Sequence, residues 1–139
     1  MSSVRRFQPE ASGDFRWDRV ELLRYKEEGS APFKDITRQV LFSPPDQAAD
    51  LRYFEIAPGG YSTLERHRHT HAVLILRGRG TVRIGTQTEQ IGEHDLVTVD
   101  PLVWHQVHAA ADRALGFLCL VAKDRDRPQL PGADEPAGV

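Results

Sequence analysis

Short runs of apolar, β-branched and aromatic residues recur along the chain, with glycine and proline between them. Such runs, at regular spacing and bounded by turn residues, are typical of an all-β sandwich or barrel. The segment 81–92 also has the pattern of a β-hairpin with its turn around residues 85–87. The pattern predicts strands at 38–43, 51–56, 63–67, 71–77, 81–84, 88–91, 96–99, 103–108 and 115–122.

The two ends of the chain depart from this pattern. Residues 17–28 fit a helical stripe and a strand alternation about equally well, so we interpret 1–35 as an N-terminal extension that is partly strand. The last residues, 124–139, are rich in proline, glycine and acidic side chains, which is typical of a loose C-terminal tail. A single β-barrel domain is therefore predicted over 36–123.

One predicted strand is apolar on both faces. Residues 72–76 read AVLIL, and a strand of this kind needs cover on both sides of its sheet. One face can line a barrel interior. The other face can pack against a second sheet of the protein, the N-terminal segment or another subunit.

Composition narrows the class of partner. The chain has 139 residues, the length of a single domain, and 18 basic against 20 acidic residues give a net charge of −2. This balance gives no general reason to bind nucleic acid or an anionic membrane. No apolar run approaches the roughly 20 residues of a membrane-spanning helix, and the N-terminus lacks the apolar core of a secretory signal. A cytoplasmic protein with no nucleic-acid or membrane partner is expected.

Histidines carry the candidate chemistry. His67, His69 and His71 lie within five residues, and His105 follows in a later predicted strand. On an extended strand Glu65 shares a face with these three, and imidazoles with a carboxylate suit a first-row transition metal. Same-face residues two apart are only about 6.6 Å apart, but those four apart are about 13 Å apart. The chain must therefore bend near 68–70 if one ion is to bind there, with His105 closing the site.

The remaining candidates favour structural roles. His108 lies three residues after His105 and so faces the opposite side of a strand. Cys119, the one cysteine, excludes an internal disulfide and a multi-cysteine zinc site, and its apolar neighbours indicate a buried small hydrophobe.

The spacing of these residues resembles that of the cupin family. The first cupin motif is matched in spacing by Gly59, five residues, Glu65-Arg66-His67, three residues, His71, six residues and Gly78. Glu65 and His71 depart from the motif in residue type. After a gap of 15 residues, the segment 94–109 follows the second motif in spacing and keeps its histidine, His105. A histidine at position 71 resembles the four-histidine, manganese-binding bacterial members.

The resemblance implies a double-stranded β-helix, or jelly-roll, barrel with a metal at one end, and commonly a homodimer. It implies one divalent transition metal (Mn, Fe, Ni, Cu or Zn) on His67, His71 and His105, with Glu65 as a fourth ligand. In a second register His67 and His69 form the histidine pair of the motif, and His71 or no residue is the third ligand. Otherwise His69 lines the pocket or contacts solvent.

Three or four protein ligands leave coordination positions for water, O₂ or a chelating substrate. Our leading hypothesis is a metal-dependent small-molecule oxidoreductase of dioxygenase type. The alternative is a non-catalytic cupin that binds or senses a small ligand, and a third is an isomerase or lyase with Glu65 as general base. We expect a small, mostly apolar pocket lined by Val73, Ile75 and either Tyr53 or Phe54, with the metal as its main polar anchor.

Overall fold

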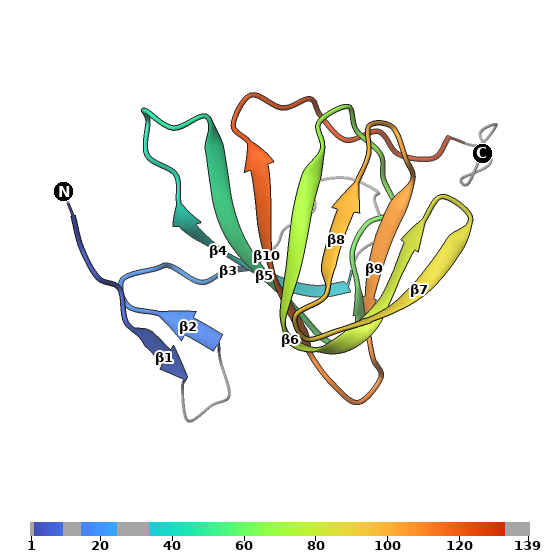
Figure 1. The fold of residues 1–139 in the computed structure, drawn as a ribbon. Helices are drawn as coiled ribbons and strands as arrows, with labels where there is room; N and C mark the ends of the chain where they lie inside the picture. The colour runs from blue at the N-terminus through green and yellow to red at the C-terminus, as the bar shows by residue number, and fades with distance from the viewer. Residues whose placement is uncertain (1, 10–14, 25–33, 133–139) are drawn as a thin grey trace.

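The computed structural model describes residues 2–9, 15–24 and 34–132, and its regular structure consists of strands (Figure 1). No helix occurs in these ranges, and so they contain no helix that is long and apolar enough to cross a membrane. The strands are β1 (Phe7–Pro9), β2 (Phe15–Trp17), β3 (Leu23–Arg24), β4 (Lys34–Phe42), β5 (Ala49–Tyr61), β6 (His71–Ile84), β7 (Gln87–Gly92), β8 (Leu96–Val99), β9 (His105–Ala109) and β10 (Leu115–Ala122).

Two long strands organise the barrel. β5 pairs with β4, β9 and β10, while β6 pairs with β7, β8, β9 and β10. Because β9 and β10 each pair with both long strands, the sheet curls on itself and closes around an interior (Figure 1). All pairings are antiparallel, and the predicted all-β jelly-roll fold is confirmed.

Three of the predicted strands differ in the structure. The runs 71–77 and 81–84 form one continuous strand, β6, in which Gly78 has φ of 76°. A side chain there would overlap the carbonyl oxygen of Ala114, so glycine lets the strand bend past its neighbour. The predicted strand at 63–67 is wrong, because only isolated bridges at Glu65 and Arg66 form there.

The strands present different faces to the interior and the outside. On β10, Phe117, Cys119 and Val121 are buried in the core, whereas Leu120 on the opposite face is half exposed. The apolar run 72–76 divides in the same way, with Val73 and Ile75 buried and Leu74 exposed. Among the described residues, therefore, nothing fully covers the outer face of this run.

Part of the outer face lies under the N-terminal hairpin of β1 and β2. Phe15 stacks on Tyr53 with a ring separation of 5.2 Å, and Trp17 meets the same ring edge-on at 5.2 Å. Tyr53 is 1% exposed, so these aromatic contacts bury it. Of the two aromatic residues considered for the pocket, Tyr53 faces this hairpin, while its neighbour Phe54 faces the interior.

The segment after β10 returns across the end of the barrel. The backbone groups of Gln129 and Arg66 exchange two hydrogen bonds of 2.7 and 3.1 Å. Asp126 binds the loop that carries the histidines. The described part of the predicted loose tail, residues 124–132, is thus tied to the candidate site, and 133–139 lie outside the described residues.

Candidate metal centre

A loop between β5 and β6 carries the first histidine. Glu65 holds this loop against β9, because its backbone N–H and C=O pair with those of His105 at 3.1 and 2.9 Å. The chain then bends at Arg68 and His69 before β6 begins at His71. This is the predicted bend, and it brings His67 and His71 to the same end of the barrel as His105.

Three histidines converge there. The ring centroids of His67, His71 and His105 lie 4.8 to 5.0 Å from one another. One ring nitrogen from each can be chosen so that all three nitrogens lie within 4.8 Å of one another. These three residues could therefore hold a metal ion.

Hydrogen bonds fix which ring nitrogen faces the interior. The Nδ1–H of His67 donates to the carbonyl oxygen of His69 at 2.7 Å, and the Nδ1–H of His105 donates to that of Val103 at 3.0 Å. A carbonyl only accepts, so Nδ1 carries the proton and Nε2 keeps its lone pair. Metal-binding histidines are commonly oriented in this way.

The ring nitrogens that remain fit a metal. Nε2 of His71 and Nε2 of His105 are buried and have no hydrogen-bond partner among the described residues. Burial lowers the pKa of His67 to about 4 and that of His71 to about 3, and it also lowers the pKa of His105. All three rings are thus neutral near pH 7, the form that binds a metal.

Glu65 and His69 lie beside this group rather than in it. Both line the same cavity, but the cluster of mutually close ligand atoms comprises His67, His71 and His105. The His69 ring stacks on His67 at 3.7 Å, and its Nδ1 lies 2.9 Å from the carboxylate of Asp126. Metal ligation by Glu65 or His69 stays a prediction.

The cavity in front of the histidines has a volume of about 180 Å³. It is small, as the sequence predicts, and its walls are mainly apolar, including Phe54, Val73 and Phe117. Its polar groups extend beyond the histidines, however. Thr63 Oγ1 and Arg52 Nε also line it, and both atoms are buried without a partner in the described part of the chain.

Sequence reasoning missed Arg52 and Thr63, and it gave Cys119 only a packing role. Cys119 is buried, as predicted, and burial raises the pKa of its thiol. Its sulfur nevertheless lines the cavity and lies 3.6 Å from Nδ1 of His71. A signal was present for Arg52, because its position in β5 alternates with two inward apolar residues, Phe54 and Ile56.

The family model of the cupin domain matches residues 52–121, about half of the chain, and this range contains all three histidines. The chain belongs to the cupin family. Its barrel, with three convergent histidines at one end, is the arrangement that the motif spacing implied.

Several cupin relatives cover most of this chain. A protein of Rhodospirillum rubrum named 1-methylthio-D-xylulose 5-phosphate methylsulfurylase is 56% identical over 127 residues, which are 91% of this chain and 81% of the relative. A crystal structure of a cupin-2 domain from Rhodospirillum rubrum has a TM-score of 0.82 at 54% identity, covering 88% of this chain and 82% of that one. A cupin 2 conserved barrel domain protein from Rhodopseudomonas palustris has a TM-score of 0.86 at 47% identity, covering 96% and 89%.

Proposed function

We propose that this cupin is a metal-dependent enzyme that acts on a 1-methylthio ketose phosphate. The Rhodospirillum rubrum relative with that substrate in its name is 56% identical over nine-tenths of this chain. The observation that carries the proposal is the cavity itself. One space of about 180 Å³ is lined by four residues that each have a buried polar atom without a described partner: His71, His105, Thr63 and Arg52. Orphaned buried polar atoms cost free energy, so a site that collects them is suited to a polar ligand.

A divalent transition metal would be held by His67, His71 and His105. When bound, such an ion acts as a Lewis acid that polarises a carbonyl or hydroxyl oxygen of the substrate. A ketose carries a carbonyl next to a hydroxyl group, which suits an ion with two open positions. We keep Mn, Fe, Ni, Cu and Zn as candidates, because imidazole ligands suit most of them.

Other residues of the cavity would bind and orient the substrate. Thr63 Oγ1 can donate to or accept from a sugar hydroxyl. The apolar wall that includes Val73, Val99 and Phe117 suits a methylthio group, and it keeps water from the reacting end.

The test is turnover of 1-methylthio-D-xylulose 5-phosphate by protein loaded separately with each metal, followed by NMR together with an oxygen electrode. We expect substrate loss that disappears in His105→Ala and persists in His108→Ala, which removes a histidine outside the triad. Absence of turnover with every metal, or turnover that survives His105→Ala, would contradict the proposal. The dioxygenase hypothesis predicts O₂ consumption in the same assay, and the non-catalytic alternative predicts binding without product.

We also propose that the protein is a homodimer that associates through the outer face of β4, β6, β8 and β10. Large apolar residues remain exposed there: Phe42, Leu74, Leu96 and Leu120. Strand pairing brings Leu74 opposite Leu96 and Leu120 opposite Ala72, so these residues form a patch on the sheet. Phe42 adjoins it through Leu51, which pairs with both Phe42 and Leu120. Light scattering should give a dimer mass for the wild type and a monomer mass for Leu120→Glu. A monomeric wild type would exclude the dimer.

A further inference from the structure

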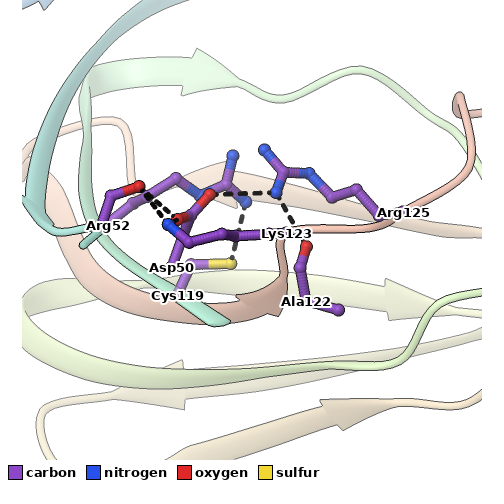
Figure 2. Close-up of polar contacts among 7 residues, drawn as sticks. Asp50, Arg52, Cys119, Ala122, Lys123 and Arg125 are labelled. Atoms are coloured by element: carbon purple, nitrogen blue, oxygen red, sulfur yellow. Dashed lines mark hydrogen bonds and ion pairs between the residues drawn. The ribbon is translucent and has the colours of Figure 1, made fainter. Parts of the chain in front are cut away.

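Arg52 is a cation on the interior face of the barrel. It alternates along β5 with Phe54 and Ile56, which also line the cavity, and it lies directly opposite Cys119 of β10. Its guanidinium packs on the ring of Phe54 at 4.9 Å. One terminal nitrogen donates to the sulfur of Cys119 at 3.5 Å (Figure 2). These contacts fix the position of the side chain but do not neutralise its charge.

Two other arginines of the barrel have carboxylate partners. Arg77 binds Glu55 at 2.8 Å, and Arg79 binds Asp112 at 2.9 Å. Among the described residues no such ion pair involves Arg52, and its Nε is buried without a partner. A buried N–H group without a partner is unfavourable, and the planar set of donors of a guanidinium matches a carboxylate or a phosphate.

A second cation approaches the same cavity from the segment after β10. Arg125 also lines the cavity, and a single nitrogen of its guanidinium contacts Asp50 at 3.2 Å and the carbonyl of Ala122 at 2.8 Å (Figure 2). Asp50 binds Lys123 as well, at 2.9 Å. One carboxylate is therefore shared by two cations, while Arg52 stands two residues along the same face of β5.

Two negative groups also line the cavity. Glu65 and Asp126 both line it, but they belong to the loop of the histidines and to the segment that braces that loop. Asp126 already accepts hydrogen bonds from the backbone N–H groups of Arg68 and His69. Of the two arginines that line the cavity, Arg52 is the one for which the described contacts give no carboxylate partner.

We propose that Arg52 and Arg125 bind the phosphate group of the substrate. This inference rests on the proposed function for the class of ligand, a ketose phosphate. Arg52 supplies a fixed, uncompensated guanidinium inside the cavity, and Arg125 supplies a second one at its mouth, where its side chain is 28% exposed. Paired arginines can bind phosphate oxygens through several charge-assisted hydrogen bonds.

The experiment compares D-xylulose 5-phosphate with D-xylulose, by calorimetry on metal-loaded protein in a phosphate-free buffer. The wild type should bind the phosphorylated sugar at least about tenfold more tightly. Arg52→Met should remove most of this preference and leave affinity for D-xylulose unchanged. Arg52→Lys should keep part of it, because the charge remains but the planar fork is lost. Arg125→Met should give a smaller loss.

Arg79→Met is the matched control, since it removes an exposed, paired arginine on β6. Metal content and thermal melting of every variant show whether the barrel is intact, and Arg125→Met tests the proposal even if Arg52→Met does not fold. Equal binding of both sugars by the wild type, binding of neither, or a preference that survives both variants would overturn the inference. A preference that depends on Arg52, in a protein that does not turn over the methylthio substrate, would instead overturn the proposed function and leave the anion site standing.

Discussion

Two neighbouring regions at the cavity differ in the charge of their side chains. At the histidines, burial suppresses charge, since the pKa values of His67 and His71 fall to about 4 and about 3. At the Asp50 cluster (Asp50, Lys123 and Arg125), charge is maintained. Hydrogen bonds from Ser43 and Lys123, opposed only in part by burial, hold the pKa of the Asp50 carboxyl well below its usual range.

The difference follows from the partners that each region offers. The three imidazoles face one another across 4.8 to 5.0 Å, so protonation of one ring would disfavour protonation of the others. Asp50 instead has two cations within 3.2 Å, so its ionised form is the stable one. Neutral imidazole nitrogens suit a metal cation, and fixed positive charge suits an anionic group. One small cavity can therefore bind a metal ion together with an anionic ligand.

Removal of one histidine should have the largest effect. We expect His67→Ala, His71→Ala or His105→Ala each to abolish near-stoichiometric metal binding, because two imidazoles are left where three converged. Elemental analysis of the purified variants measures this directly. His94→Ala and His108→Ala are the controls, since neither residue belongs to the cluster. Retention of metal by a triad variant would show that other residues, such as Glu65 or His69, complete the site.

Acid should separate the two regions in metal-free protein. A histidine whose pKa is lowered on folding binds more protons when unfolded, so stability falls as pH drops below about 6.5 toward the folded values of about 4 and about 3. Each such histidine contributes a slope of up to about 1.4 kcal/mol per pH unit in that window. Asp50 also has a lowered pKa, but its contribution is complete above about pH 4 and is lost only below it.

Urea unfolding between pH 7 and pH 3 tests this order. His71→Ala should flatten the slope between about pH 6.5 and pH 4, whereas Asp50→Asn should change it only below about pH 4. Added metal should steepen the loss between pH 7 and pH 5, because protons then compete with the ion for the rings. A difference in slope between Asp50→Asn and the wild type that appears above pH 5, instead of below about pH 4, would contradict the assignment.

A smaller effect is expected when the carboxylate of the charged region is neutralised near pH 7. Asp50→Asn should lower the free energy of unfolding by about 1 to 3 kcal/mol, because Lys123 and Arg125 lose a partly buried counter-charge. Asp112→Asn is the matched control. Its pair with Arg79 is largely exposed and should contribute under about 1 kcal/mol. Equal losses for the two variants would show that the Asp50 cluster behaves as an ordinary surface pair.

The sequence predicted the histidine region better than the charged region. Three histidines within five residues are conspicuous, and the rise per residue of a strand alone required the bend that the structure has at Arg68 and His69. The range 71–84 was predicted as two strands, since its glycines read as breaks. Only the close approach of Ala114 explains why Gly78 continues a strand instead.

The charged region depends on contacts between distant parts of the chain. Asp50 meets Lys123 and Arg125 only because β5 and β10 pair along eight positions, from Ala49 with Ala122 to Ile56 with Leu115. Composition alone indicated a loose tail from residue 124 onward. Arg52 could have been found from its alternation with Phe54 and Ile56, but its lack of a counter-charge is a property of the folded barrel.

The smallest expected effect concerns the link between the histidines and the chain that follows β10. Asp126 accepts hydrogen bonds from the backbone N–H groups of Arg68 and His69, and it lies 2.9 Å from Nδ1 of His69, whose ring stacks on His67. Its carboxyl pKa is held well below the usual range, chiefly by the hydrogen bond from Arg68. Asp126 is therefore a positioning residue for the His67 loop.

We expect Asp126→Asn to weaken metal binding by up to about tenfold, as loss of an outer partner of a metal ligand commonly does, without removing the metal at saturating concentration. Competition titration with a chelator measures the affinity, and Asp124→Asn, an exposed neighbour, is the control. The relative size of the losses in Asp126→Asn and His69→Ala separates two roles for His69. If His69 only braces His67, Asp126→Asn lowers affinity and His69→Ala lowers it similarly. If His69 is itself a ligand, as the second motif register predicts, His69→Ala lowers metal affinity far more than Asp126→Asn does. The group of metal-binding histidines then includes His69.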